Sequence, residues 1–566
     1  MNKTERGQRM PHKSFLRNSS YLALVALAVL LLSSVLSAAQ DEDKRPNILL
    51  VVVDDMGYSD IGCFGGEVRT PTIDALAESG LRMTSYYVAP TCSPTRSMLM
   101  TGTDNHLAGL GTMKEALVDN QKGKPGYEGH INDRVVTIAS LLRDAGYHTY
   151  MAGKWHLGTE IEHDPFNRGF EHAYTLLQGG ASHFDDEWMM YANYTPTYRE
   201  DGQRVHVPRG FFSSEFYVDK MINYIDRDKD DKPFFGYLSF TAPHDPLHLP
   251  DEWLDKYKGR YDQGYDALRK ERLDRMKKLG IMSKDVELSH RLPMIPEWDT
   301  MTVEQKRVEA RRMELYAGMV ENMDHHLGRL IKHLKETGKY DNTLIIFFSD
   351  NGAAATEFHQ YPDTDKAWIE KNSDNRYENM GKRGSRINMG FNWSVSSNTP
   401  LRYFKGVHSE GGIRVPCIIA GPGVKKTGQI DSTLAHVMDI APTLLDVAGV
   451  SHPSQFQGHK VHPMMGKSMR PYLEGKADVI RNDSETVSWE LFGRRVIRQG
   501  RWKAIWLDSP LGTDDWQLFD IVSDPTERND LAESHKDKLR ELIMLWENYA
   551  DSVGVVLPIA TPKLSD

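Results

Sequence analysis

Asn47-Ile-Leu-Leu-Val-Val-Val53, followed at once by Asp54-Asp55, is a continuous apolar run that ends in two carboxylates. A run of this length, rich in β-branched residues, predicts a strand buried on both faces, which is typical of a parallel sheet. Shorter apolar runs recur at residues 149–152, 234–241 and 344–348, with helical patterns between them. This alternation predicts an α/β fold with a large, mainly parallel central sheet flanked by helices.

Each of these four predicted strands is followed by polar side chains able to bind a metal ion or an anion. In chain order they are Asp54, Asp55, Lys154, His156, His244, Asp350 and Asn351. Ligands of open α/β sheets bind outside the carboxyl ends of the strands, so we expect these side chains to converge at one sheet edge. Any one of them could instead cap the next helix, but four such ends in one chain favour a shared site.

Four members of this set, three aspartates and one asparagine, form an all-oxygen ligand set. They are Asp54, Asp55, Asp350 and Asn351. Hard oxygen donors suit Ca²⁺ or, less well here, Mg²⁺, whereas zinc usually recruits His or Cys. The other candidate side chains are cationic: Arg96, Lys154, His156, His244 and Lys405. A metal with several cations, in a chain of net charge −10, indicates a strongly anionic substrate group such as sulfate or phosphate.

The pentapeptide Cys92-Ser-Pro-Thr-Arg96 precedes a predicted helix. Pro94 suits the first helical position, which makes Ser93 the expected N-cap, and the helix should end near Gly102. Cys92 would then lie at a helix N-terminus that favours anions, with the planar cation of Arg96 one turn further on. A lone cysteine is also a common small hydrophobe, so this pentapeptide alone leaves a reactive group and a packing residue equally open.

The composition is that of a globular protein, with 566 residues, 40% hydrophobic and 26% charged. The net charge of −10 argues against a broad basic surface for nucleic acid. Basic residues before position 18, an apolar run at 21–36 and small residues at 37–39 predict a secretory signal peptide at residues 1–39. We therefore expect export to the periplasm or medium and no stable membrane span after cleavage; a retained anchor is the alternative.

The sequence pattern of the remaining chain changes near residue 480, from alternating strands and helices to consecutive strands followed by one helix. We predict a catalytic α/β domain at residues 40–480, which includes a helix at 434–448, and a C-terminal subdomain at 481–566. In that subdomain, strand patterns at 487–507 and 516–521 and an amphipathic helix at 536–549 predict a small antiparallel sheet with one helix. An odd number of cysteines, three, leaves at least one without a disulfide partner, and Cys92 is the one we expect to have a role other than a disulfide. Cys63 and Cys417 either pair or stay free.

Taken together, these motifs resemble the sulfatase family of the alkaline-phosphatase-like superfamily, most closely the bacterial arylsulfatases. The resemblance is carried, in the family's order, by residues 46–55, 92–96, 146–158, 243–244, 349–352 and 411–416. It extends into the C-terminal subdomain and covers nearly all of the mature chain. The set is far more specific than any one of its motifs.

The resemblance implies that a dedicated maturation enzyme oxidises Cys92 to formylglycine, whose hydrate attacks the sulfur of a sulfate ester. It also implies one Ca²⁺ ion, held by a formylglycine oxygen and by residues Asp54, Asp55, Asp350 and Asn351. Lys154 would neutralise the sulfate, and Arg96 would hold the hydrate. His244, together with Lys405, would protonate the leaving alcohol, and His156 would deprotonate the second hydroxyl. Lys405 lies in a variable loop, where a solvated lysine is the alternative.

We therefore predict a sulfuric ester hydrolase that acts on aryl or carbohydrate sulfates. A phosphodiesterase or phosphonate monoester hydrolase of the same superfamily is one alternative, because phosphorus and sulfur oxyanions look alike to such a site. A non-catalytic binder of sulfated glycans is another. Five further histidines are given no catalytic role: His106, His325, His326, His359 and His408. His325 and His326 are interpreted as surface or packing residues. A position lining the pocket is the alternative for His106, and a contact with substrate is the alternative for His359 and His408, which lie in an irregular segment.

Overall fold

Residues 45–188, 190–192, 194–361 and 363–559 are described by a computed structural model. The expected signal peptide at residues 1–39 lies outside these residues. Among the described helices, none combines the length and the apolar character needed to cross a lipid bilayer.

The first predicted strand, β1 (Asn47–Val53), is buried along its whole length inside an eleven-stranded sheet. It pairs in parallel with β7 (Phe234–Ser239) on one side and with β8 (Thr343–Ser349) on the other. Beyond β7, the strand β3 (His148–Lys154) continues the parallel arrangement. The predicted α/β fold with a mainly parallel central sheet is therefore confirmed, and the carboxyl ends of these four strands share one edge.

The outer strands of the sheet include antiparallel pairs. The strand order is β10-β2-β9-β8-β1-β7-β3-β4-β5-β6, and β11 also pairs with β2. β9 runs antiparallel to both β2 and β8, and β4, β5 and β6 form an antiparallel edge. These strands are β2 (Leu81–Tyr87), β4 (His172–Leu176), β5 (Tyr198–Glu200), β6 (Gln203–Val205), β9 (Arg414–Ala420), β10 (Ile430–Asp431) and β11 (Ala435–His436).

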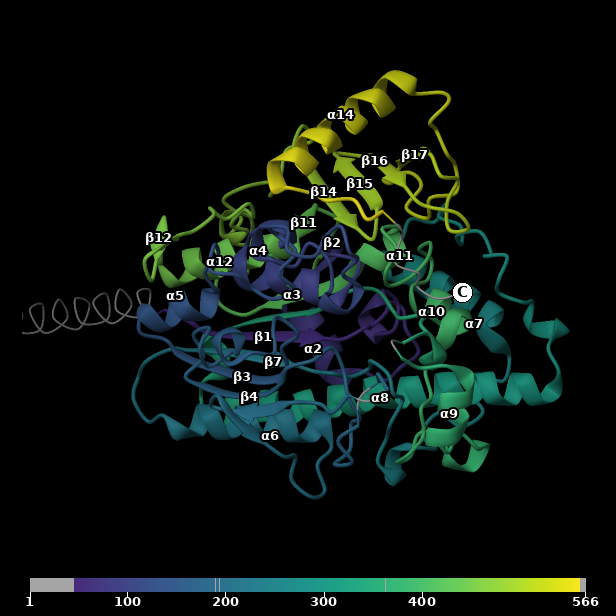
Figure 1. Ribbon diagram of the computed structural model, residues 1–566, viewed down its shortest axis with the longest axis horizontal. Coiled ribbons are helices and arrows are strands. Elements are labelled where there is room, and N and C mark those ends of the chain that lie inside the picture. Colours follow the sequence, from purple (N-terminus) through teal and green to yellow (C-terminus); the bar gives the residue numbers. More distant parts are fainter. Residues whose placement is uncertain (1–44, 189, 193, 362, 560–566) are drawn as a thin grey trace, which may run out of the picture. The chain divides into compact units, whose positions relative to one another are not determined.

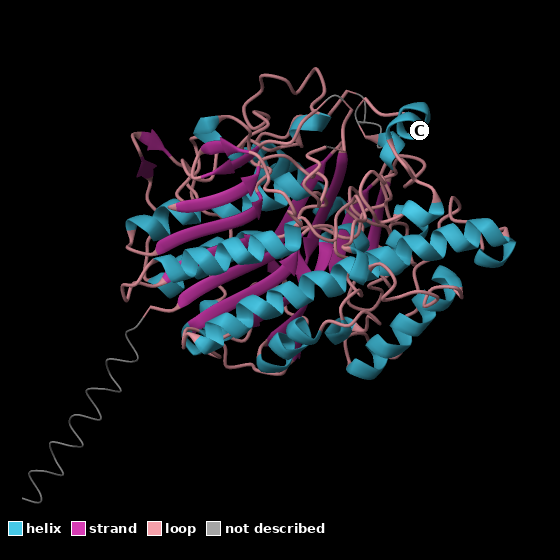
Figure 2. Ribbon diagram, turned by 90° about the horizontal axis from the view of Figure 1, so that it is seen from below, coloured by secondary structure: helices cyan, strands magenta, loops and turns pink. Residues whose placement is uncertain are grey.

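Helices cover both faces of the sheet (Figure 1). α2 (Pro71–Ser79), α6 (Ser213–Arg227) and α8 (Val303–Glu336) pack together on one face, which Figure 2 shows from that side. α3 (Cys92–Thr101), α5 (Ile138–Asp144) and α12 (Ile440–Ala448) pack on the other. The other α-helices that precede the C-terminal sheet in the described residues are α4 (Asn105–Ala108), α7 (Gly264–Leu279), α9 (Lys366–Asn372), α10 (Gly390–Ser397), α11 (Glu410–Ile413) and α13 (Arg470–Leu473).

A separate antiparallel sheet follows near the C-terminus, as predicted. It contains β14 (Thr486–Leu491), β15 (Arg494–Gln499), β16 (Trp502–Trp506) and β17 (Trp516–Asp520), and α14 (Lys536–Val553) packs on it (Figure 1). Leu542 and Trp546 of α14 join Ile497, Ala504 and Leu518 in a small core of their own. A further two-stranded ribbon pairs β12 (Gln455–Phe456) with β13 (His459–Lys460). The domain boundary near residue 480 stays a prediction.

Two predicted helices differ from the structure at their N-termini. α3 begins at Cys92 itself, and its N-cap is Thr91 rather than Ser93, with no side-chain cap hydrogen bond. The helix predicted at 434–448 begins only at Ile440, because Ala435 and His436 pair in parallel with β2 and a 3₁₀ turn follows. The question left open for Cys63 and Cys417 is answered too, since every cysteine among the described residues is free and buried.

Candidate active site

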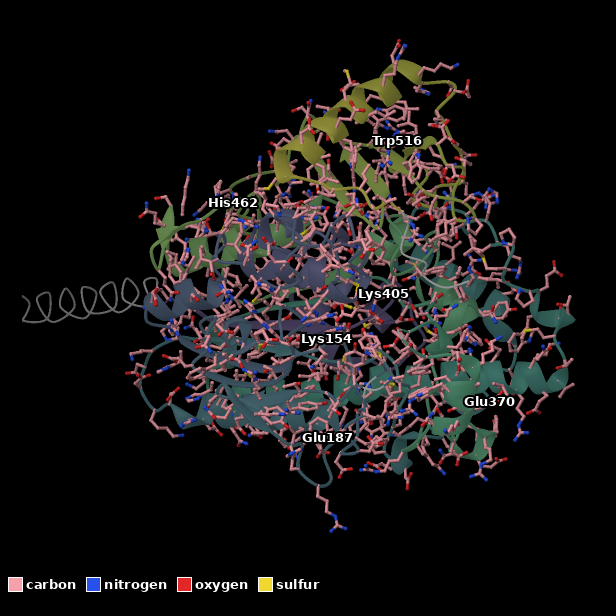
Figure 3. All side chains as sticks on the ribbon, viewed as in Figure 1. Lys154, Glu187, Glu370, Lys405, His462 and Trp516 are labelled. Carbon is pink, nitrogen blue, oxygen red and sulfur yellow. The ribbon has the colours of Figure 1, made fainter. Side chains whose placement is uncertain are left out.

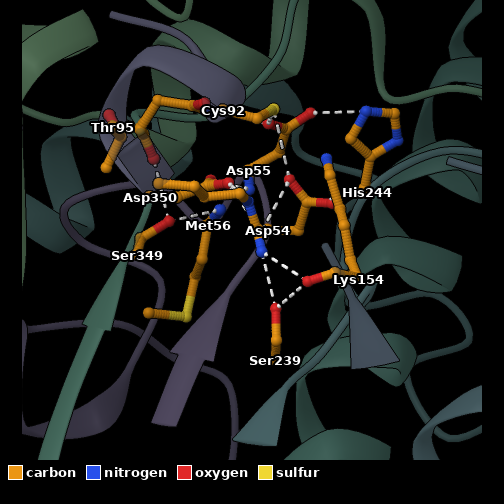
Figure 4. Close-up of polar contacts among 12 residues, drawn as sticks. Asp54, Asp55, Met56, Cys92, Thr95, Lys154, Ser239, His244, Ser349 and Asp350 are labelled. Carbon is orange, nitrogen blue, oxygen red and sulfur yellow. Dashed lines mark hydrogen bonds and ion pairs between the residues drawn. The ribbon is translucent and has the colours of Figure 1, made fainter. Parts of the chain in front are cut away.

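Side chains from the ends of four parallel strands meet at the N-terminus of α3 (Figure 4). The Sγ atom of Cys92 lies 3.4 Å from Oδ1 of Asp54 and 4.0 Å from Oδ1 of Asp55. His244 completes the group, with Nε2 at 3.4 Å from Oδ2 of Asp55. Potential ligand atoms of Asp54, Asp55, Cys92 and His244 all lie within 4.8 Å of one another, and all four residues are buried.

Hydrogen bonds from backbone N–H groups to side chains tie the turn after β1 to the end of β8. Asp55 has a φ of 64°, a left-handed conformation that Asp tolerates better than most residues. Its N–H donates to Oδ1 of Asp350 at 3.3 Å, and the N–H of Met56 donates to Oγ of Ser349 at 2.9 Å. The two predicted ligand pairs, Asp54-Asp55 and Asp350-Asn351, lie almost three hundred residues apart in the sequence and are therefore held at a defined spacing.

Two lysines neutralise the two carboxylates that follow β1. Nζ of Lys154 lies 2.7 Å from Oδ2 of Asp54, and Nζ of Lys405 lies 2.6 and 2.9 Å from the two oxygens of Asp55. Lys154 and Lys405 lie in the same central region of Figure 3. Burial alone would raise the pKa of Asp55, but His244, Lys405 and Lys154 hold it below its ordinary value.

The loop that carries Lys405 is attached to the segment before Cys92. The N–H of Gly406 donates to the carbonyl of Pro90 at 2.7 Å, and that of Lys405 donates to the carbonyl of Ala353 at 3.1 Å. The Lys405 side chain is only 13% exposed. The solvated lysine considered from the sequence is therefore not what the structure shows.

Arg96 lies beneath the site, and its guanidinium is fully buried. It donates two hydrogen bonds, of 2.9 and 2.7 Å, to Oδ2 of Asp350. Its NH1 also donates to the carbonyl of Lys154 and to Oγ of Ser239, at 3.1 and 2.6 Å. The guanidinium of Arg96 therefore holds a candidate metal ligand and the end of β3. Its expected contact with the hydrate formed from Cys92 stays a prediction, because Cys92 is present here as the thiol.

The two predicted histidines differ in their surroundings. Nδ1 of His244 lies 2.8 Å from the carbonyl of Asp245, to which it donates, so Nε2 is the atom free to exchange a proton. Burial lowers the pKa of His244 to about 3, although Asp55 opposes this effect. His156 has a φ of 60°, and its buried ring has a lowered pKa, again chiefly through burial.

The residues present fit a hard divalent cation. Nδ2 of Asn351 donates to Oδ1 of Asp55 at 2.6 Å, and this orients its amide. The other amide atom, Oδ1 of Asn351, is buried and has no hydrogen-bond partner within the described chain. An unpaired buried oxygen is costly, and a cation next to Asp54 and Asp55 would satisfy it.

The thiol of Cys92 is a poor nucleophile as it stands. Burial, together with the charge of Asp350, raises its pKa far above the ordinary value, although Lys154 and Lys405 act in the opposite direction. Because the thiolate is the reactive form, an unmodified Cys92 stays protonated and inert near neutral pH.

Sequence reasoning missed Glu115, whose Oε1 lies 3.6 Å from Nε2 of His156. It also missed Tyr191 and Tyr361, whose rings pack 5.8 Å apart and whose phenols lie near the charge of Lys405. These residues come from loops without a regular pattern, so no spacing could have found them.

The other histidines are placed elsewhere. His106 is buried between Asp104 and Glu490, and His325 and His326 lie on α8. His408 is buried without a hydrogen-bond partner in the described structure, and His359 lies in a short 3₁₀ turn.

Two family models match the chain. The model described as Sulfatase matches residues 46–450, and the model described as N-sulphoglucosamine sulphohydrolase, C-terminal, matches residues 402–548. The first match spans every strand end that contributes to the site.

Curated relatives and solved structures agree with these matches. An arylsulfatase of Klebsiella aerogenes is 43% identical over 450 residues, which cover 79% of this chain and 96% of that protein. An uncharacterized sulfatase of Schizosaccharomyces pombe is 42% identical over 530 residues, with 91% and 95% covered. The crystal structure of Ps i-CgsB in complex with k-i-k-neocarrahexaose has a TM-score of 0.65 and 26% identity, with 92% and 95% covered.

Proposed function

Because this chain belongs to the sulfatase family, and is therefore an enzyme that hydrolyses sulfate esters, we propose that its nucleophile is a formylglycine made from Cys92. We also propose that one divalent metal ion, Ca²⁺ in preference to Mg²⁺, is bound by Asp54, Asp55, Asp350 and Asn351. The observation that carries the proposal is the position of Cys92, 3.4 Å from Asp54 within a cluster of potential metal ligands.

The chain's own residues would bind the sulfate group and move its protons. When present, the metal supplies positive charge at the sulfate oxygens, and the formylglycine hydrate supplies the attacking hydroxyl. Lys154 and Lys405 are placed to exchange their contacts with Asp54 and Asp55 for contacts with sulfate oxygens, where charge develops in the transition state. Arg96 keeps Asp350 in place throughout.

His244 is the proposed acid for the leaving alcohol. Its Nδ1 is committed to the carbonyl of Asp245, so the transferred proton is carried on Nε2. In the free site burial keeps the ring neutral; a bound sulfate anion favours the protonated ring and so prepares it to donate.

Substrates of the aryl sulfate and carbohydrate sulfate classes both remain within this proposal. The name of the Klebsiella relative supports aryl sulfates, whose good leaving groups ask little of the surrounding pocket. The test compares the sulfate and phosphate monoesters and the phosphodiester of one nitrophenol. Faster sulfate cleavage, abolished by Cys92→Ala, supports the proposal; faster cleavage of either phosphorus ester refutes it in favour of the phosphohydrolase alternative.

We further propose that the chain is exported and meets a formylglycine-generating maturation enzyme on the way. The support is the signal-like sequence at residues 1–39 and the intact Cys92-Ser-Pro-Thr-Arg96 motif. Fractionation of cells that express the full chain tests export, because retention of all the protein in the cytoplasm would contradict it.

A further inference from the structure

Glu115 and His156 form a carboxylate–imidazole pair at the edge of the active site. Glu115 lies in a single 3₁₀ turn, η2 (Lys114–Ala116), in the loop between α4 and α5. Its Oε1 is 3.6 Å from Nε2 of His156, and the two side chains are 23% and 7% exposed. At this distance the pair is a close approach rather than a formed hydrogen bond, and it becomes an ion pair only when His156 is protonated. Both side chains lie mostly out of the screening solvent.

The backbone and the packing at Gly179 restrict the position of the His156 ring. The N–H of His156 donates to the carbonyl of Leu177 at 3.2 Å, and its φ of 60° is a left-handed backbone conformation just after β3 ends. A Cβ at Gly179 would lie 2.8 Å from Cε1 of His156, so the ring packs against a position where only glycine fits. Neither ring nitrogen has a hydrogen-bond partner within the described residues. The ring is thus held in place while its nitrogens stay available.

The charges that act on this ring come from three elements. Burial is the main effect that opposes protonation of His156, and the cations Lys154, at the end of β3, and Arg96, on α3, add to it. Glu115 is the carboxylate that favours protonation. In return, His156 holds the pKa of Glu115 below its ordinary value against the effect of burial, with a smaller contribution from Lys114. The phenol of Tyr191 also lies near Glu115, whose charge contributes to the raised pKa of that phenol after the larger effect of burial.

We propose that Glu115 is a positioning residue, which orients the His156 imidazole and stabilises its cationic form each time His156 takes up a proton during turnover. The pairing follows from the geometry alone; only the identity of the proton donor, a hydroxyl of the formylglycine hydrate, rests on the proposed function. In that step the O–H bond breaks, the oxygen keeps the electron pair, and the proton moves to the neutral ring. Glu115 stays ionised, so the imidazolium forms beside a negative charge.

Glu115→Gln removes the charge and keeps the shape of the side chain. In the full-length, metal-loaded protein with ¹³C-labelled histidines, we expect the His156 titration midpoint to fall by about one pH unit. With an aryl sulfate, we expect kcat to fall about tenfold, with KM changed less than about twofold and the acid limb of kcat moved to lower pH. Glu115→Asp, which keeps the charge, should restore part of the lost kcat and bring the His156 titration midpoint partly back to its wild-type value.

Glu160→Gln is the matched control, because Glu160 lies four residues after His156 and contacts Thr159 instead. It should leave the midpoint and kcat unchanged. An unchanged His156 midpoint in Glu115→Gln would overturn the proposal. A raised KM with unchanged kcat would also overturn it, because Glu115 would then contact substrate directly. If the wild type cleaves no sulfate ester, the proposed function fails, yet the midpoint measured in Glu115→Gln still decides whether the pair exists.

Discussion

Lys405→Ala should change activity and metal affinity in opposite directions. Nζ of Lys405 contacts both oxygens of Asp55, at 2.6 and 2.9 Å, from a side chain that is 13% exposed. Loss of a cation that stabilises charge in a transition state typically costs a factor of about 10²–10³ in kcat, or about 3–4 kcal/mol. The same cation competes with a divalent metal for Asp55, so its removal should strengthen metal binding.

The gain in metal affinity can be bounded from the structure. A unit charge at 4 Å contributes about 4 kcal/mol at an effective dielectric constant of about 20, and partial solvent access lowers this value. Since a flexible lysine can also turn away from Asp55, we expect roughly a tenth of the wild-type dissociation constant, which corresponds to about 1.4 kcal/mol.

The assay pairs steady-state hydrolysis of a nitrophenyl sulfate with calorimetric titration of metal-stripped protein by Ca²⁺. Lys278→Ala, at an exposed position on α7, removes an equal charge from the solvent-facing surface and should change neither quantity. Weaker Ca²⁺ binding in Lys405→Ala, or a kcat within about twofold of wild type, would refute the placement of Lys405 as a sulfate-binding cation that competes with the metal.

Two further predictions concern buried charges. Arg96→Met leaves the buried carboxylate of Asp350 without its partner, so we expect the free energy of unfolding to fall by about 3–5 kcal/mol. Urea titration of the wild type and the variant, both with unconverted Cys92, measures this fall. Equal unfolding midpoints would contradict the prediction. His106 lies 2.8 Å from Asp104 and 3.1 Å from Glu490, which raise its pKa to about 9 against the effect of burial. Because the folded pKa exceeds the unfolded one, this stabilisation is complete below about pH 6.5 and is lost as the pH rises through 9, by about 3 kcal/mol. In His106→Gln the free energy of unfolding should no longer fall between about pH 6.5 and 9. A wild-type free energy of unfolding that stays constant over this pH range would show the reasoning to be wrong.

The central strands were predictable because burial on both faces leaves an unbroken apolar run. β1, β3, β7 and β8 each carry such a run and end in polar residues, so both their existence and their common edge followed from the pattern. The start of α12 was not predictable, because the pairing of Ala435 and His436 with β2 is a long-range contact that overrides local helical preference.

In the candidate site, too, some features followed from the sequence pattern and others depended on long-range contacts. Residues that directly follow strands, such as Asp54 and Asp350, could be placed from topology alone. The direction of the Arg96 side chain could not, because it depends on acceptors from β3 and β7 that no motif marks. Glu115 carries no sequence signal at all, since its contact with His156 depends on the path of an irregular loop.

The state of Cys92 in active enzyme tests the central claim most directly. The account predicts that the peptide containing Cys92, from protein produced with a formylglycine-generating enzyme, carries an aldehyde that a hydrazine reagent traps. It also predicts that specific activity rises in proportion to the converted fraction, because the buried thiol is protonated and unreactive. Full activity in protein whose Cys92 is entirely an unmodified thiol would contradict the account.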